Sequence, residues 1–280
     1  MIFCSPKYPP SSFPESLPEY LQKQQQQSSA AVFLERLPID ADDALIDEVS
    51  AVITRSFAGN HKTTGEAMFD WAIGPDFPRD DPACEAKRIE WLGFYMKWCL
   101  LMSLEYGLVL IARERDRTGK VLGAVCSYPP GNADKALTFG WHMIKIGYRM
   151  RRGPSEVLGK EPNKRVETTG VVMNQLHNPA EAASTASNPS GTPPWYIHIL
   201  ATDIAAQGKG CGSALLRCIH YLADRDAADT MLEYSGTRKE GYYCGKHGYE
   251  NFGEKVTLPD PLACSGTAAI RGYRQPRLPL

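Results

Sequence analysis

Apolar positions recur with strand and helix spacing from the first third of the chain onward. The run Val32–Leu37 predicts a short strand. Residues 40–43 then supply an N-cap and an acidic first turn for a helix whose apolar positions continue through Phe57. A second helix is expected to begin after Asp81, with proline in its first turn, and to stop near Gly107.

Two β-rich runs follow this second helix directly. Leu108–Arg113 and Lys120–Tyr128 are separated by a polar turn that contains Thr118 and Gly119. This pattern is typical of an antiparallel hairpin. Two prolines after Tyr128 are expected to end the second strand.

The second half of the chain alternates between strand and helix patterns. Its expected elements are a helix at Ala136–Met150, a strand at Trp195–Thr202, a helix at Ser213–Ala223, a strand at Asp229–Tyr234, a short helix at Arg238–His247, a strand at Tyr249–Thr257 and a last strand at Thr267–Arg274. Strands and helices that alternate in this way predict a mixed α/β fold.

Two segments of low complexity suggest the domain boundaries. Residues 1–30 combine prolines, serines and a glutamine run, a composition that buries too little apolar surface to fold, so we expect a disordered tail. Residues 177–194 have a similar composition and predict a flexible surface loop. We therefore expect one domain over residues 31–280, with an insertion at about 131–194 that ends in this loop.

Composition and charge limit the binding partners and the cellular compartment that can be expected for this protein. The 280 residues carry a net charge of −1 with a pI near 6.6, so no basic surface for nucleic acid is expected. The eight cysteines are scattered without a Cys-x-x-Cys pair, which predicts no metal site and reduced thiols in the cytoplasm or the nucleus. No signal peptide and no membrane span are expected from the apolar pattern. The oligomeric state cannot be predicted from the sequence.

A glycine-rich turn between the strand at 195–202 and the following helix is the strongest chemical signal. Glycines allow close approach of the backbone to an anion, and the free amides and dipole of a helix N-terminus attract a phosphate. A P-loop is excluded because Lys209 lies between glycines instead of after them. A dinucleotide site would need a different glycine spacing and an acidic residue such as Asp226 or Asp229 about 20 residues on. The Gln/Arg-x-x-Gly-x-Gly/Ala loop of acyl-CoA transferases fits Gln207, Gly210 and Gly212 position for position.

The segments around this loop follow the order found in one superfamily. They are the strand WYIHILAT, the loop AAQGKGCG, the helix SALLRCIHYLADR, the strand TMLEYSG and the late segment YYCGKHGY. In this order, residues 195–249 resemble the GNAT superfamily of acetyl-CoA-dependent N-acetyltransferases. The resemblance is weaker over residues 32–128. It implies a mixed, mostly antiparallel central sheet flanked by helices, and acetyl-CoA held between two splayed strands.

The resemblance also implies roles for individual residues. The backbone of Leu200, Ala201 and Thr202 is expected to contact the acyl-pantetheine arm. The pyrophosphate is expected on the loop formed by Gln207, Gly208, Lys209, Gly210, Cys211, Gly212 and Ser213. In the family, a tyrosine four residues before a late glycine protonates the leaving thiolate. Cys244 occupies that place here, and Tyr243 stands one residue earlier, so Tyr243 takes the role or the role is vacant.

Proton transfer from the amine needs a base, for which the sequence offers two candidates. His198 lies on the strand before the loop and Glu233 on the next strand, although either residue also suits a structural role. Cys211 and Cys244 lack the partners of a cysteine nucleophile and are expected to pack as small apolar residues.

Two further groups of residues are expected to be structural. Trp91, Phe94, Tyr95 and Trp98 recur at helical spacing, which favours core packing over an acceptor pocket. The basic group Arg149, Arg151 and Arg152 fits a solvated helix end.

The function predicted from the sequence is transfer of an acetyl group from acetyl-CoA to a primary amine of a small molecule or a protein, by direct attack in a ternary complex. Two alternatives stay open. One is an acyl-CoA-binding sensor or interaction domain of the same fold that does not transfer the group. The other is an oxidoreductase that binds a dinucleotide at the glycine-rich loop.

Overall fold

A computed structural model describes residues 19, 21, 32–60, 65–115, 118–133, 141–151, 153–176, 193–257 and 268–275. The helices are α2 (Asp43–Ala58), α3 (Ala67–Ile73), α4 (Pro82–Tyr106), α6 (Trp141–Met150), α7 (Glu161–Leu176), α9 (Cys211–Arg225) and α10 (Thr237–Glu240), with a 3-10 turn η2 (Ile204–Ala206) and a π-helical segment η3 (Gly241–Lys246). The strands are β1 (Val32–Arg36), β2 (Leu108–Glu114), β3 (Val121–Tyr128), β4 (Trp195–Thr202), β5 (Thr230–Ser235), β6 (Glu250–Thr257) and β7 (Ala268–Arg274).

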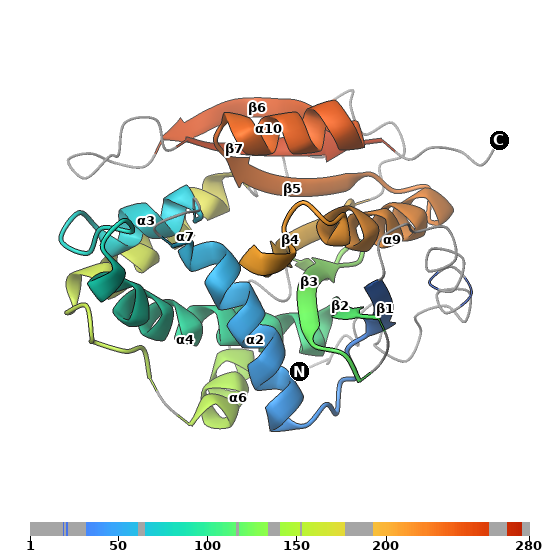
Figure 1. Cartoon of the computed structure of the whole chain (residues 1–280). Coiled ribbons are helices and arrows are strands. Elements are labelled where there is room, and N and C mark those ends of the chain that lie inside the picture. The colour runs from blue at the N-terminus through green and yellow to red at the C-terminus, as the bar shows by residue number, and fades with distance from the viewer. Residues whose placement is uncertain are drawn as a thin grey trace.

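In the described residues, these strands form one seven-stranded sheet in the order β1-β2-β3-β4-β5-β7-β6 (Figure 1). All neighbouring pairs are antiparallel except β4 and β5, which run parallel. The predicted mixed, mostly antiparallel sheet flanked by helices is therefore confirmed. Strands β1 and β7, from the two ends of the described chain after residue 31, lie in this same sheet. The single domain over residues 31–280 stays a prediction.

The two faces of the sheet are covered by different helices. Residues of α2, α3 and α4 pack on one face in a first hydrophobic cluster that includes Tyr128, Tyr196 and Ile199. Residues of α9 pack on the other face in a second cluster with Trp195 and Ile197. Because alternate residues of β4 point to opposite faces, this one strand anchors both clusters.

The two predicted helices before the hairpin, α2 and α4, begin and end close to where the sequence predicts. Asp42 caps α2 by accepting a hydrogen bond from the amide of Leu45 (2.8 Å), and Asp81 caps α4 through the amide of Ala83 (2.8 Å). Trp91 is fully buried and Phe94 nearly so, both in the first cluster. The expected core role of this aromatic group is confirmed for both residues.

The inserted segment contributes two helices. The predicted helix at 136–150 is described from Trp141 onward as α6, and its end carries the exposed residues Arg149 and Arg151. Helix α7 was not predicted. Its Arg165 donates hydrogen bonds to the carbonyls of Ala72 (2.7 Å) and Ile73 (2.9 Å) at the end of α3. The insertion therefore stabilises the position of α3 on the first face of the sheet.

Two predicted low-complexity segments lie mostly outside the described residues. Of the predicted tail, residues 1–30, the structure describes only Glu19 and Leu21, and Leu21 is buried in the second cluster. Of the predicted loop at 177–194, it describes only residues 193 and 194. No helix within the described ranges is long and apolar enough to cross a membrane.

Asp229, the residue before β5, leads to a testable dependence of stability on pH. Its side chain is 2% exposed, and burial raises its pKa from 3.8 to about 6. A raised pKa in the folded state contributes stability below about pH 4, which is lost as the pH rises through 6. We expect Asp229→Asn to be more stable than the wild type at pH 8 by on the order of 1 kcal/mol, and the gain to vanish near pH 4.

Urea unfolding at the two pH values measures this difference. Asp40→Asn is the control, because Asp40 is exposed and its replacement should change neither value. Equal stability of Asp229→Asn and the wild type at pH 8 would contradict the burial argument.

Candidate functional site

The site forms where β4 and β5 separate. Their parallel pairing covers only Trp195 to Ile197 on β4 and Thr230 to Leu232 on β5. Beyond these residues, β4 continues to Thr202 along β3, and β5 continues to Ser235 along β7. The two strands thus stop pairing and separate at the centre of the sheet, and this separation is called the opening between β4 and β5 below. The glycine-rich loop follows the end of β4.

A β-bulge lies at the point of separation. Cys126 of β3 pairs with Ile199, whereas the next residue, Ser127, pairs with Ile197. His198 is therefore the extra residue of β4. Bulges bend a strand and redirect its side chains, and they are frequent beside active sites.

The glycine-rich loop ends in an exposed helix N-terminus. Gly210 is the N-cap of α9, adopts a left-handed conformation with φ 82°, and provides no side-chain cap. The first amides of a helix have no acceptor within the helix, so they can donate to an anion. The loop has the geometry expected of a phosphate cradle, and the exposed side chain of Lys209 adds positive charge.

An ion pair holds the base of this loop. Asp203 accepts hydrogen bonds from the amide of Ala205 (3.1 Å) and from Arg55 of α2, whose Nε lies at 3.2 Å and whose terminal nitrogen lies at 2.5 Å. Burial opposes ionisation of Asp203, yet these hydrogen bonds and the charge of Arg55 lower its pKa. Because α2 covers the other face of the sheet, this contact links the loop to the opposite layer.

The first turn of α9 contacts the late π-helical segment. A Cβ atom at Gly212 would lie 3.1 Å from Oγ1 of Thr202 and 3.3 Å from the hydroxyl of Tyr242. The hydroxyl of Ser213 lies 3.2 Å from that of Tyr242 and 3.1 Å from Nε2 of His247. Glycine at position 212 therefore keeps the cradle open between β4 and η3.

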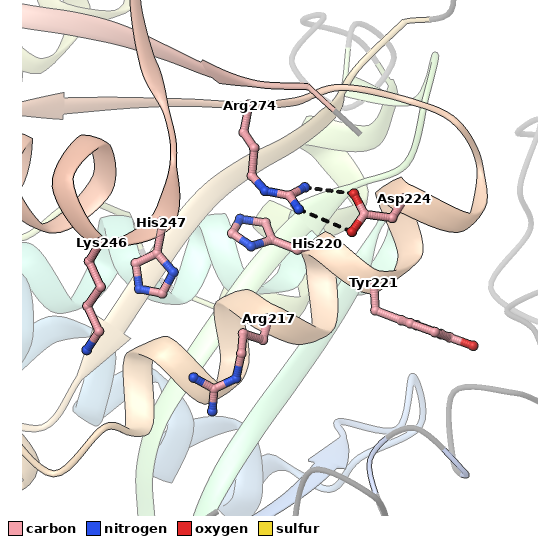
Figure 2. Close-up of a pocket in the computed structure, with 7 residues that line it drawn as sticks. All are labelled: Arg217, His220, Tyr221, Asp224, Lys246, His247 and Arg274. Atoms are coloured by element: carbon pink, nitrogen blue, oxygen red, sulfur yellow. Dashed lines mark hydrogen bonds and ion pairs between the residues drawn. The ribbon is translucent and has the colours of Figure 1, made fainter. Parts of the chain in front are cut away.

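The surroundings of His247 disfavour the charged form of its imidazole. Burial, followed by the charges of Lys246, Arg217 and Arg274, lowers its pKa to about 4. Figure 2 shows these residues around one pocket, with Arg217 on α9, Lys246 at the end of η3 and Arg274 on β7. The imidazole thus serves as an uncharged hydrogen-bond partner of Ser213.

The two predicted base candidates lie on either side of the opening. His198 and Glu233 are the first residues of β4 and β5 beyond the paired stretch. The ring of His198 lies 5.8 Å from those of both Tyr128 and Tyr196. Burial, then the charge and hydrogen bond of Glu233, raises the pKa of Tyr196 well above its ordinary value. Both candidates therefore contact the same tyrosine, Tyr196.

Tyr243, the predicted proton donor, packs among other tyrosines. Its ring centroid lies 5.1 Å from that of Tyr242, 5.4 Å from Tyr234 and 5.8 Å from Tyr249, and burial raises its pKa. Cys244, at the place of the family tyrosine, has its sulfur 3.4 Å from the hydroxyl of Tyr234. The tyrosine whose hydroxyl reaches the first turn of α9 is its neighbour, Tyr242.

The cysteine of the loop, Cys211, is not suited to act as a nucleophile. Cys211 is 1% exposed, and burial raises the pKa of its thiol to about 11. A protonated thiol is a poor nucleophile. This supports the packing role expected for Cys211.

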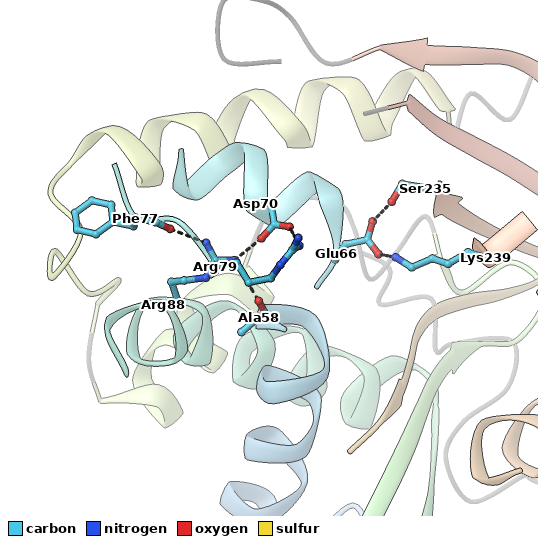
Figure 3. Close-up of polar contacts among 8 residues, drawn as sticks. All are labelled: Ala58, Glu66, Asp70, Phe77, Arg79, Arg88, Ser235 and Lys239. Carbon is cyan, nitrogen blue, oxygen red and sulfur yellow. Dashed lines mark hydrogen bonds and ion pairs between the residues drawn. The ribbon is translucent and has the colours of Figure 1, made fainter. Parts of the chain in front are cut away.

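A second polar group links the first layer of helices to the end of β5. Glu66, which precedes α3, accepts hydrogen bonds from Ser235 (2.5 Å) and Lys239 (Figure 3). Burial lowers the pKa of Lys239 to about 8. Behind this contact, Arg88 of α4 binds Asp70 of α3. These ion pairs anchor α3 and the residue before it beside the opening between β4 and β5.

Sequence reasoning missed three residues of this site. Arg55 and Tyr196 become relevant only through contacts between segments distant in the chain, so no local signal could identify them. Tyr242 stands beside the predicted Tyr243, and a pair of tyrosines at the late segment is the signal that could have included it.

Comparisons with known proteins give structural matches only. No family model and no curated protein matches the sequence. The fold is similar to that of arylalkylamine N-acetyltransferase 2 from Aedes aegypti, with a TM-score of 0.52 and 12% identity over 87% of this chain and 98% of the other. A histone acetyltransferase HPA2-related protein from Corynebacterium glutamicum gives a TM-score of 0.45 and 20% identity over 88% and 98%. The protein thus has the fold of the GNAT acetyltransferases, which confirms at the level of fold the resemblance found in the sequence.

Proposed function

We propose that this protein is an N-acetyltransferase that moves the acetyl group of acetyl-CoA to a primary amine in a ternary complex. The observation that carries the proposal is the opening between β4 and β5, with the glycine-rich loop and the uncapped N-terminus of α9 beside it. An extended thioester with a pyrophosphate needs both features, because its charged part requires amide donors and its acyl end requires a buried groove.

The donor is held by the loop and by β4. Residues 207–213 provide amides and the charge of Lys209 for the pyrophosphate, and the backbone of Leu200, Ala201 and Thr202 lines the arm. Gly212 fits this role, since a Cβ there would contact Thr202 and Tyr242. The acyl end then lies toward the point where the strands separate, beside His198 and Glu233.

Residues at the opening and one residue of η3 transfer the protons of the reaction. Nitrogen attacks the thioester carbonyl, a C–N bond forms and the C–S bond breaks. His198 or Glu233 accepts the proton of the amine, and Tyr243 donates a proton to the leaving sulfur. Positioning of the two substrates supplies the remaining rate enhancement, and no covalent enzyme intermediate is needed.

The acceptor proposed is a small-molecule amine, as the name of the Aedes aegypti enzyme indicates for that protein. One observation favours the alternative of an acyl-CoA sensor, namely that Cys244 stands at the place of the family tyrosine. The protein is proposed to act in the cytoplasm or the nucleus, where acetyl-CoA is present and thiols stay reduced.

Titration of acetyl-CoA and of NAD into the wild type, followed by a thiol-release assay with a panel of amines, tests the proposal. Binding of acetyl-CoA with turnover of at least one amine is the expected result. Binding without turnover would favour the sensor, and binding of NAD alone would favour the oxidoreductase. Failure of a folded protein to bind acetyl-CoA would overturn the acetyltransferase proposal.

Tyr242→Phe tests the contact between the late segment and the cradle. The variant loses the hydroxyl that lies 3.2 Å from that of Ser213. One lost hydrogen bond corresponds to about 1 kcal/mol, so the Kd for acetyl-CoA should rise about fivefold. Calorimetric titration measures this change.

Tyr243→Phe is the matched comparison for this variant. Its hydroxyl is assigned to proton donation, so the variant should keep the Kd of the wild type and lose part of kcat. An unchanged Kd in Tyr242→Phe would remove Tyr242 from the donor site.

A further inference from the structure

Lys239 places a primary amine of the chain itself beside the end of β5. It belongs to α10, which begins two residues after β5 ends at Ser235. Its ammonium group binds one carboxylate oxygen of Glu66, and the hydroxyl of Ser235 donates to the other oxygen at 2.5 Å (Figure 3). One carboxylate group therefore separates Nζ of Lys239 from Oγ of Ser235. The proposed transfer reaction assigns no role to Lys239.

The end of β5 leads directly to the opening between β4 and β5. Glu233 is the first residue of β5 beyond the stretch paired with β4, and Ser235 follows it by two positions. Residues two apart on a strand point to the same face and are separated by about 7 Å. Because a lysine side chain has a flexible four-carbon stem, rotation of Lys239 away from Glu66 can carry its Nζ atom over such a distance. In the proposed reaction the acyl group lies beside Glu233, so this amine can reach it.

The surroundings of Lys239 favour the neutral form of its amine, which is the nucleophilic one. Burial lowers its pKa to about 8 although Glu66 contacts it. Lys164 provides a comparison within the same chain, because it also contacts a glutamate, Glu161, at 2.7 Å. Its side chain is 67% exposed, and the hydrogen bond and charge of Glu161 raise its pKa. The two lysines thus have the same type of partner, and burial is what distinguishes them.

We propose that Lys239 is a site of self-acetylation, at which the protein transfers the acetyl group of its bound acetyl-CoA to its own side chain. This modification rests on the proposed function, because it needs the same bound donor. Glu66 accepts one proton from the ammonium group of Lys239, and the neutral Nζ atom attacks the thioester carbonyl. A C–N bond forms and the C–S bond breaks. Nitrogen loses its second proton in this step, and the sulfur takes up a proton and leaves as the thiol of coenzyme A.

Acetylation of Lys239 changes the charge beside the opening. The neutral amide that it produces cannot form an ion pair with Glu66, whose side chain is 17% exposed. The negative charge of Glu66 is then no longer compensated by Lys239. An uncompensated carboxylate at this place favours the binding of a positively charged amine. Self-acetylation thus adjusts the acceptor preference of the same site.

Incubation of the purified full-length chain with acetyl-CoA that carries a ¹³C-labelled acetyl group, without any amine, tests the proposal. Peptide mapping by mass spectrometry gives the rate of label uptake at each lysine. At pH 7, Lys239 should be labelled at least about tenfold faster than Lys164, because more of its amine is neutral and the thioester is bound beside it. The labelled fraction at a given time should not change on dilution of the protein, since the transfer takes place within one chain.

Three variants test the origin of the label. Lys239→Arg keeps the positive charge beside Glu66 and removes the acetylated amine, so residue 239 should gain no label while the Kd for acetyl-CoA stays that of the wild type. Lys164→Arg is the matched control, because it makes the same exchange in an exposed Lys–Glu pair and should leave the labelling of Lys239 unchanged. Gly210→Glu, which weakens donor binding, should slow the labelling of Lys239 and leave that of Lys164 unchanged.

Equal labelling of Lys239 in the wild type and in Gly210→Glu would overturn the proposal, because it would show chemical acetylation without a bound donor. Calorimetric titration of acetyl-CoA and the thiol-release assay, performed on the same preparation, separate this proposal from the proposed function. Donor binding and amine turnover without label on Lys239 would overturn self-acetylation and leave the proposed function intact. Failure of the folded protein to bind acetyl-CoA would overturn both.

Discussion

Gly210→Glu should raise the Kd for acetyl-CoA by at least about 100-fold, which corresponds to about 2.7 kcal/mol. Gly210 caps α9 with φ 82°, at the point where the free amides of the helix meet the loop. A carboxylate at this place repels a pyrophosphate and competes with it for the same amides. Calorimetric titration of the purified variant measures the loss.

A matched variant separates this effect from backbone strain. Gly131 has nearly the same conformation, φ 78°, and a Cβ there would meet nothing within 4 Å. It follows the end of β3 that pairs with the start of β4, whereas the loop follows the end of β4. Gly131→Glu should therefore cost similar stability and leave the Kd unchanged. Equal Kd values for Gly210→Glu and the wild type would show that the loop does not hold the donor.

Replacing the base should lower kcat by about 10²- to 10⁴-fold, the usual contribution of general base catalysis. Glu233→Gln and His198→Gln each keep the shape and remove the basicity of one candidate. The variant with the larger loss identifies the base, since both residues lie at the opening and both contact Tyr196. Steady-state kinetics with the best amine of the panel gives kcat.

The Kd for acetyl-CoA is the internal control of this experiment. It should stay within about twofold of the wild type in both variants, because neither residue belongs to the cradle. An additional variant, Tyr196→Phe, tests whether Tyr196 positions the base, which would change the pH profile of kcat. Wild-type kcat in both Glu233→Gln and His198→Gln would rule out a base at this opening.

Several predicted elements agree with the structure because their signals are local. The caps at Asp42 and Asp81, the polar turn at Gly119 and the β-forming run 195–202 depend on residues within a few positions of each other. Helix α3 and helix α7 were missed. Helix α3 has only seven residues, too few to show an apolar period. Contacts such as that of Arg165 of α7 with the end of α3 stabilise both helices.

In the late segment, too, one feature was predicted from local signals and another depends on the tertiary structure. The sequence predicts a short helix at 238–247, and the structure has α10 followed by a π-helical segment. In this π-helical segment the hydroxyl of Tyr242 points toward Ser213, whereas the ring of Tyr243 packs among other tyrosine rings. Helical spacing counted along the sequence cannot predict which of two adjacent tyrosines reaches the loop, because an extra residue per turn rotates every side chain after it.

By itself, the sequence determined the class of fold, the glycine-rich turn before a helix and the identity of the residues available for the chemistry. These follow from local propensities and from the spacing of residues along the chain. Only the tertiary structure decided that β4 and β5 separate after three paired residues, that His198 occupies a bulge, and that Arg217, Lys246 and Arg274 meet in one pocket. Each of these depends on the register between strands or on packing between distant segments, and burial and charge there take values that no single segment specifies.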